Sequence, residues 1–181
     1  MNQSDGRKLL KFARDCVYSE LFEKELNISP EIRKFSQKQG VFVTIHKRGE
    51  LRGCIGFVIG HFPLYEGIKN AAHSAAFEDP RFPPVDRSEW DDLDFEISVL
   101  SVPEEIKAEP SELPKKIEIG KDGLICESGP YSGLLLPQVA TEWKWGAEEF
   151  LSHTCMKAGL PAEFWKTGKC RFRKFRAEVF S

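Results

Sequence analysis

Hydrophobic residues near the start of the chain recur at helical spacing. Between about residues 5 and 26 they lie three or four positions apart, with charged residues between them. This period places the apolar side chains on one face of an α-helix and the charges on the other. Asn27 and Pro30 follow, and both are typical of helix ends. We predict an N-terminal helix whose packed face carries Leu9, Phe12, Ala13, Cys16, Val17 and Leu21.

Two later stretches, residues 40–101 and 123–181, show the same order of predicted elements. Each has two strands joined by a tight turn, then a helix, then a third strand. In the first stretch the strands are Val41–His46, Glu50–Val58 and Asp94–Ser101, with a helix at about 63–77. In the second they are Leu124–Glu127, Tyr131–Leu136 and Arg171–Phe180, with a helix at about 147–158. We predict a β-β-α-β unit used twice, with chance similarity between two ordinary α+β halves as the alternative.

The linker between these stretches, residues 102–116, is rich in proline and glutamate. It is too short to hold two independent domains apart. We therefore expect residues 1–181 to form one α+β domain. Its two similar lobes would share one core, with the N-terminal helix packed on that core and a cleft between the lobes.

Composition narrows the class of protein. Of the 181 residues, 41% are hydrophobic, which favours a packed core over disorder. A net charge of −2 excludes a large basic field, so nucleic acid is a weak candidate partner. No apolar run approaches the ~20 residues that cross a bilayer, and the opening residues lack the apolar core of a signal peptide. We expect a cytoplasmic protein without membrane contact.

The five cysteines are widely separated along the chain, at Cys16, Cys54, Cys126, Cys155 and Cys170. Without a secretion signal, this pattern indicates reduced thiols rather than a disulfide framework. No CxxC pair exists, and His153 and Cys155 lie about 200° apart around a predicted helix. We therefore expect no metal site. No cofactor is predicted either, because the chain has neither a GxGxxG nor a Walker motif.

The segment Leu51–Gly56 (LRGCIG) carries the leading candidate chemistry. Strict alternation along a strand would point Arg52 and Cys54 to the same face. A guanidinium beside a thiol favours the nucleophilic thiolate, and Gly53 and Gly56 would leave room for a ligand. Cys54 is thus the candidate nucleophile, and the alternative is a small buried residue.

A nucleophilic cysteine usually needs a base and an orienting group. His73, at the edge of an apolar helix stripe, is the candidate base, and a solvated histidine is the alternative. Glu96 lies within an apolar strand and is the candidate orienting group or general base. Arg52 is its expected partner, either in a binding site or in a purely structural ion pair.

The proline-rich loop Asp79–Val85 could present Arg81 to a carboxylate or phosphate. The alternative is a helix stop in which Phe82 fills the core and Arg81 pairs with Asp79 or Asp86. In the second stretch, the strand that would correspond to LRGCIG has neither a cation nor a thiol, so that half is interpreted as scaffold.

Four segments together, residues 51–56, 79–85, 96–100 and 133–139, resemble the AMMECR (AMME chromosomal-region) protein family. The resemblance runs from about residue 8 to the C-terminus. It implies an α+β fold of a larger and a smaller subdomain with a cleft between them, and no established reaction. It also implies an association with Memo-like and radical S-adenosylmethionine proteins in a pathway that modifies RNA or a small metabolite. The family's suspected site would correspond to Arg52 and Cys54.

Two hypotheses of function follow. In the first, the protein is an enzyme or a substrate-handling subunit: Cys54, Glu96 and His73 would serve catalysis, while Arg52, Gly53, Gly56 and Arg81 would bind an anionic ligand. In the second, it is a non-catalytic adaptor that binds a small-molecule or protein partner through the same cleft.

Overall fold

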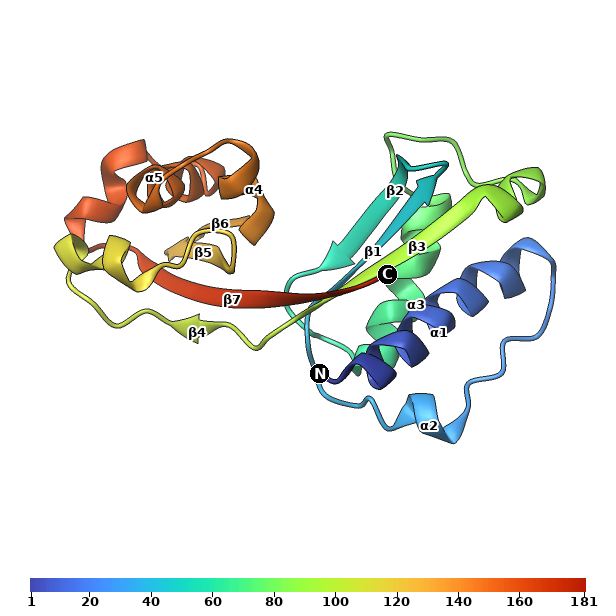
Figure 1. Ribbon diagram of the computed structural model, residues 1–181. Helices are drawn as coiled ribbons and strands as arrows, with labels where there is room; N and C mark the ends of the chain where they lie inside the picture. Colours follow the sequence, from blue (N-terminus) through green and yellow to red (C-terminus); the bar gives the residue numbers. More distant parts are fainter. The chain divides into compact units, whose positions relative to one another are not determined.

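The computed structural model describes residues 1–181. Helices and antiparallel strands are interspersed along the chain (Figure 1). This confirms the predicted α+β class. Chain contacts define two units, the first comprising Met1–Leu100 with Glu178–Ser181 and the second comprising Ser101–Ala177. None of the helices has both the length and the apolar composition that crossing a bilayer requires.

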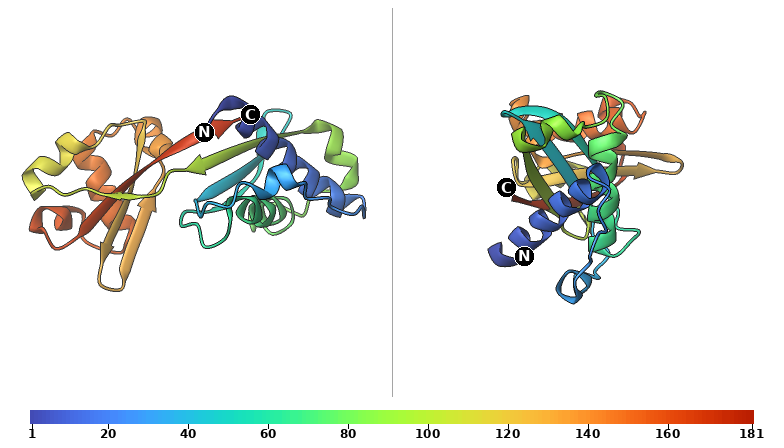
Figure 2. Two further views of the ribbon diagram at one scale, coloured as in Figure 1. Left: turned by 90° about the horizontal axis from the view of Figure 1, so that it is seen from below. Right: turned by 90° about the vertical axis from the view of Figure 1, so that its right-hand side faces the viewer.

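The first unit is a three-stranded sheet covered by helices. Its elements are α1 (Gln3–Leu21), α2 (Pro30–Arg33), β1 (Val41–Lys47), β2 (Glu50–Phe57), α3 (Leu64–Phe77), the 3-10 helix η1 (Arg87–Asp92) and β3 (Leu93–Leu100). The strand order is β2-β1-β3, and both pairings are antiparallel. Helices α1 and α3 pack side by side against this sheet (Figure 1 and Figure 2).

Alternation along β1 divides the sheet into a packed face and a second face. Val41, Val43 and Ile45 are fully buried and belong to the core with α1 and α3. The intervening Phe42 and Thr44 are half-buried, on the face away from those helices.

The N-terminal helix ends earlier than its apolar pattern predicts. Asn2 caps its start by accepting a hydrogen bond from the Asp5 N–H. Its end is set by Glu23, which adopts a left-handed conformation with φ of 55°, and by the Lys24 N–H, which bonds back to the Ser19 carbonyl. This ending without glycine left no clear signal in the sequence.

The second unit contains the remaining strands and its own helices. Its elements are β4 (Glu104–Glu105), the 3-10 helix η2 (Pro110–Lys116), β5 (Asp122–Ser128), β6 (Tyr131–Leu135), α4 (Pro137–Glu142), α5 (Ala147–Lys157), the 3-10 helix η3 (Ala162–Thr167) and most of β7 (Arg171–Phe180), whose residues from Glu178 onward belong to the first unit. The predicted linker is part of this unit, because β4 pairs with β7 and Leu113 of η2 is buried. Buried apolar side chains form one cluster in each unit, rather than the single shared core that the linker length led us to expect.

The two units place corresponding elements in the same order. The sheet order β2-β1-β3 in the first matches β6-β5-β7 in the second. A glycine on β2 and one on β6 each touch the backbone of the following long helix: a Cβ on Gly53 would lie 2.0 Å from the Ala75 oxygen, and one on Gly133 would lie 2.3 Å from the Ala158 nitrogen. These matches support the internal repeat, which stays a prediction.

Candidate functional site

Arg52 is held in a buried ion pair with Glu89 of η1. Its Nε and Nη2 donate to the two carboxylate oxygens of Glu89 at 3.0 and 2.9 Å, and Nη2 also donates to the Pro84 carbonyl. Lys47 donates to the same carboxylate at 2.8 Å. Glu89 in turn accepts from the Asp86 N–H and completes a capping box at the start of η1. Arg52 therefore holds the proline-rich loop, through Pro84, and η1, through Glu89, against β2.

Arg52 does not share a face with Cys54, because the strand contains a bulge. Gly53 pairs with Ile45 and Leu51 pairs with His46, so Arg52 is an extra residue without a partner on β1. The strict alternation behind the sequence-based expectation fails at this residue. The expected pairing of Arg52 with Glu96 is likewise replaced by the pair with Glu89.

Gly53 allows α3 to approach β2 closely. Because a Cβ at this position would lie only 2.0 Å from the Ala75 carbonyl oxygen, only glycine permits this contact. The last turn of α3 thus lies directly on the strand. Asp79, which follows that turn, is thereby brought to the edge of β2.

Asp79 and Arg81 together bind the backbone of Cys54. The Cys54 N–H donates to Asp79 Oδ2 at 2.9 Å, and Arg81 Nη2 donates to the Cys54 carbonyl at 3.1 Å. Arg81 also donates to both carboxylate oxygens of Asp79, at 2.9 and 2.7 Å. Hydrogen bonds from Arg81 are the main reason that the pKa of the Asp79 carboxyl is lowered. The pair with Asp79 is the structural alternative raised for Arg81, whose side chain nevertheless stays 53% exposed.

The Cys54 side chain belongs to a row of polar groups across the second face of the sheet. Thr44 lies opposite Cys54 on β1, and their Oγ1 and Sγ atoms are 3.2 Å apart. Thr44 is also opposite Glu96 on β3. With Arg81 at the outer edge of β2, the order across the sheet is Arg81, Cys54, Thr44, Glu96; we call this set the Cys54 row. Cys54, Thr44 and Glu96 are each half-buried.

Gly56 accommodates an aromatic ring. A Cβ there would lie 2.5 Å from the side chain of Phe42, its partner on β1. The ring thus packs across the glycine, a role that the sequence analysis assigned to a ligand.

His73 lies on α3, away from Cys54. Its Nδ1 is 2.8 Å from Glu20 on α1, and its Nε2 is 3.4 Å from Glu78. The hydrogen bond with Glu20 is the largest cause that raises the pKa of His73. This imidazole borders a cavity of about 440 Å³ that Cys16 also lines. Since α3 packs on the opposite face of the sheet from the Cys54 row, the structure does not bring His73 to Cys54 as a base.

The cysteine side chains of this protein lie in different environments. Burial raises the pKa of the Cys16 thiol to about 12, so this cysteine is an inert core residue. Three further cysteines, Cys126, Cys155 and Cys170, form a cluster that was not predicted from the sequence, with their sulfurs within 4.8 Å of one another. No sequence motif predicts this cluster, because its three cysteines come from separate parts of the chain.

Acid is expected to weaken the fold through Glu89. Hydrogen bonds from Arg52, and then from Lys47, lower the pKa of Glu89 from 4.5 to about 2. A carboxylate whose pKa is depressed in the folded state stabilises that state above its unfolded pKa. This stabilisation, on the order of 2 kcal/mol, should therefore be lost as the pH falls from about 4.5 to about 2. Urea unfolding at a series of pH values measures how steeply the free energy of unfolding falls as the pH is lowered. Glu89→Gln should make this dependence shallower. The same pH dependence in both proteins would show that Glu89 is not its source.

A family model, related sequences and a solved structure all match this chain over most of its length. The model of the AMMECR1 family matches residues 10–180. A protein of Methanothermobacter thermautotrophicus is 48% identical over 183 residues, covering 99% of this chain and 95% of its own. A protein of Thermococcus gammatolerans is 52% identical, covering 97% of this chain and 89% of its own.

A solved structure shares the fold. The crystal structure of the uncharacterized protein PH0010 from Pyrococcus horikoshii matches with a TM-score of 0.85 and 45% sequence identity. The match covers 99% of this chain and 92% of that one. Sequence and fold agree over nearly the whole length: the chain belongs to the AMMECR1 family.

Proposed function

We propose that this protein is a substrate-handling protein whose Cys54 row binds a small molecule bearing an anionic group. The observation that carries this proposal is the fixed position of Arg81. Its guanidinium is anchored to the Cys54 carbonyl and to Asp79, yet half of the side chain is exposed. A preorganised cation beside a half-buried thiol suits recognition of a carboxylate or phosphate.

Binding is favoured over autonomous cysteine catalysis because no histidine accompanies the thiol. The Sγ atom of Cys54 meets the Thr44 hydroxyl, which is not a base at neutral pH. Glu96 lies two strands from Cys54, roughly 10 Å away along the sheet. It is placed to accept a proton or a hydrogen bond at the far end of a ligand held by Arg81.

The resemblance to the family supplies a context for this role. The resemblance implies an association with Memo-like and radical S-adenosylmethionine proteins, so these are the proposed partners in a shared modification pathway. The adaptor hypothesis also keeps one supporting observation: Arg52, Gly53 and Gly56 all serve packing. In an adaptor Cys54 would be a packing residue too.

Alkylation of Cys54 by a neutral and an anionic reagent tests the proposal. In a Cys170→Ser background, native Cys54 should react with iodoacetamide on the order of 100-fold faster than the buried cysteines, which require local opening. Arg81 should favour iodoacetate by about 1 kcal/mol, so Arg81→Gln should lower the iodoacetate-to-iodoacetamide rate ratio about fivefold.

Arg48→Gln is the matched control, because Arg48 pairs with Asp92 and takes no part in the Cys54 row. It should leave the rate ratio unchanged, and circular dichroism checks the fold of each variant. A Cys54 that reacts only after unfolding would favour the adaptor. A reactive Cys54 with a rate ratio insensitive to Arg81→Gln would refute the anion site.

A further inference from the structure

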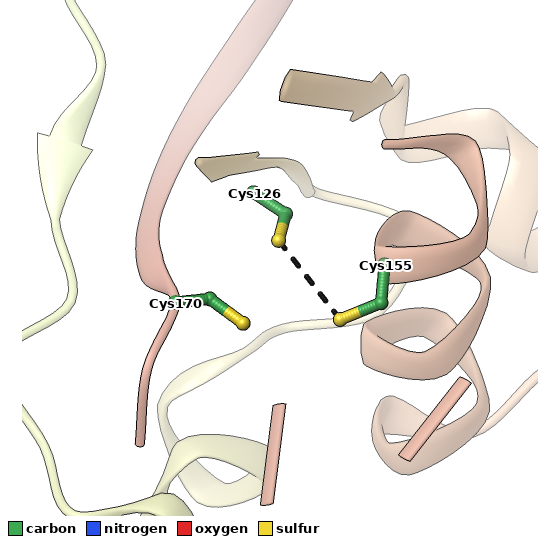
Figure 3. Close-up of side chains that lie close together, drawn as sticks. All are labelled: Cys126, Cys155 and Cys170. Atoms are coloured by element: carbon green, nitrogen blue, oxygen red, sulfur yellow. Dashed lines mark hydrogen bonds between the residues drawn. The ribbon is translucent and has the colours of Figure 1, made fainter. Parts of the chain in front are cut away.

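Three cysteine sulfurs converge inside the second unit (Figure 3). Cys126 extends from β5, Cys155 from α5, and Cys170 directly precedes β7. The Sγ atoms of Cys126 and Cys155 are 3.9 Å apart, and all three sulfurs lie within 4.8 Å of one another. Tertiary structure, rather than a local motif, thus builds a three-thiol cluster.

One pair of these sulfurs has the spacing of two ligands on a common metal ion. With metal–sulfur bonds of about 2.3 Å, sulfur ligands lie about 3.8 Å apart in a tetrahedral site and about 4.0 Å apart in a trigonal one. The Cys126–Cys155 separation falls between these values. Two packed thiols alone would have a similar spacing, so the third sulfur, Cys170, is the distinguishing feature.

The donor set indicates the class of ion. No histidine or carboxylate joins the three sulfurs, and the cluster lies among core residues that include Phe150, Phe172 and Trp165. Soft thiolates select Cu(I) and Zn(II) over harder ions. Structural zinc sites are almost always four-coordinate, whereas three thiolates complete a trigonal Cu(I) site.

We propose that Cys126, Cys155 and Cys170 form an all-sulfur binding site for one thiophilic d10 metal ion, with Cu(I) as the best match to three donors. Binding replaces the thiol protons, which are released to solvent as the metal–sulfur bonds form. No redox step is involved.

A route into the site exists through Cys170. Cys126 and Cys155 are fully buried, but Cys170 lines a cavity of about 440 Å³. The charged residues around this cavity are Glu105, Lys107, Glu109, Lys169 and Arg171. Their excess of one positive charge partly balances the negative charge of a metal–trithiolate centre. An ion can therefore bind first at Cys170 and then engage the two inner sulfurs.

Metal titration of the reduced full-length chain tests the site. Cu(I), supplied in competition with a chromophoric Cu(I) chelator, should bind at one ion per chain, with three sulfur scatterers in X-ray absorption. Cys170→Ser and Cys170→Ala should each weaken Cu(I) binding at least about 100-fold. Even the replacement of a residue that only hydrogen-bonds to a metal ligand lowers metal affinity about 10–100-fold. Cys16→Ala, which removes a buried thiol outside the cluster, should not change it.

A parallel titration with Zn(II) decides between the two ions. Tighter zinc binding with the same dependence on Cys170 would keep the site and replace Cu(I) with Zn(II). Absence of stoichiometric binding of either ion, or affinity insensitive to both Cys170 variants, would overturn the proposal. Because Cys170 is at the edge of the core, a thermal melt of each variant separates loss of the ligand from loss of the fold.

Discussion

Replacing Glu89 with alanine is expected to lower the free energy of unfolding by about 3–5 kcal/mol, because the change leaves a buried guanidinium without its carboxylate. Arg52 is only 8% exposed and makes two of its hydrogen bonds to Glu89. The variant also loses the capping box of η1. Urea unfolding at neutral pH measures the difference.

Asp91→Ala is the matched control for this change. Asp91 lies in the same 3-10 helix but is exposed, so its removal should shift stability by no more than about 0.5 kcal/mol. The double variant Arg52→Met/Glu89→Leu should recover much of the loss, since it removes both charges together. Equal stability of Glu89→Ala and Asp91→Ala would show that Arg52 does not depend on its partner.

The Gly53→Ala substitution is expected to cost about 3 kcal/mol through steric overlap. The new Cβ would meet the Ala75 carbonyl oxygen at 2.0 Å, and this oxygen belongs to the backbone, which cannot rotate away. Helix α3 would have to move off β2. Differential scanning calorimetry and urea unfolding both measure the effect.

Gly146→Ala provides the comparison for this second substitution. At Gly146 the backbone has φ of −79°, and a Cβ would meet only the Glu149 side chain, at 3.7 Å. Its cost should stay near 1 kcal/mol, the usual value for an N-cap. If Gly53→Ala were as stable as Gly146→Ala, helix α3 would be able to move away from β2 at little cost in stability.

The elements were largely predictable from sequence because their apolar patterns are local. Strand β7 has the predicted bounds, Arg171–Phe180, and α3 starts within one residue of its prediction. The alternation that predicts a strand says nothing about an inserted residue, so the bulge at Arg52 was missed. The face assigned to this arginine was consequently wrong.

The partners of the candidate residues could not be predicted, because they lie far away along the chain. Glu89, the partner of Arg52, is 37 residues away. His73 has helical spacing that fits either a site or a helix interface, and only tertiary packing shows that it faces Glu20. The cysteine cluster depends in the same way on how β5, α5 and β7 assemble. The division into subdomains and the cleft between them stay predictions.

The side-chain clamp on Cys54 has a consequence for solubility. Strand β2 is the terminal strand of its sheet, and its outward backbone groups would otherwise be open to a strand from another molecule. The Cys54 amide and carbonyl are already hydrogen-bonded to Asp79 and Arg81, so they are not available to pair with a strand of a neighbouring chain. The loop that presents the candidate ligand-binding cation therefore also protects the protein against edge-to-edge aggregation.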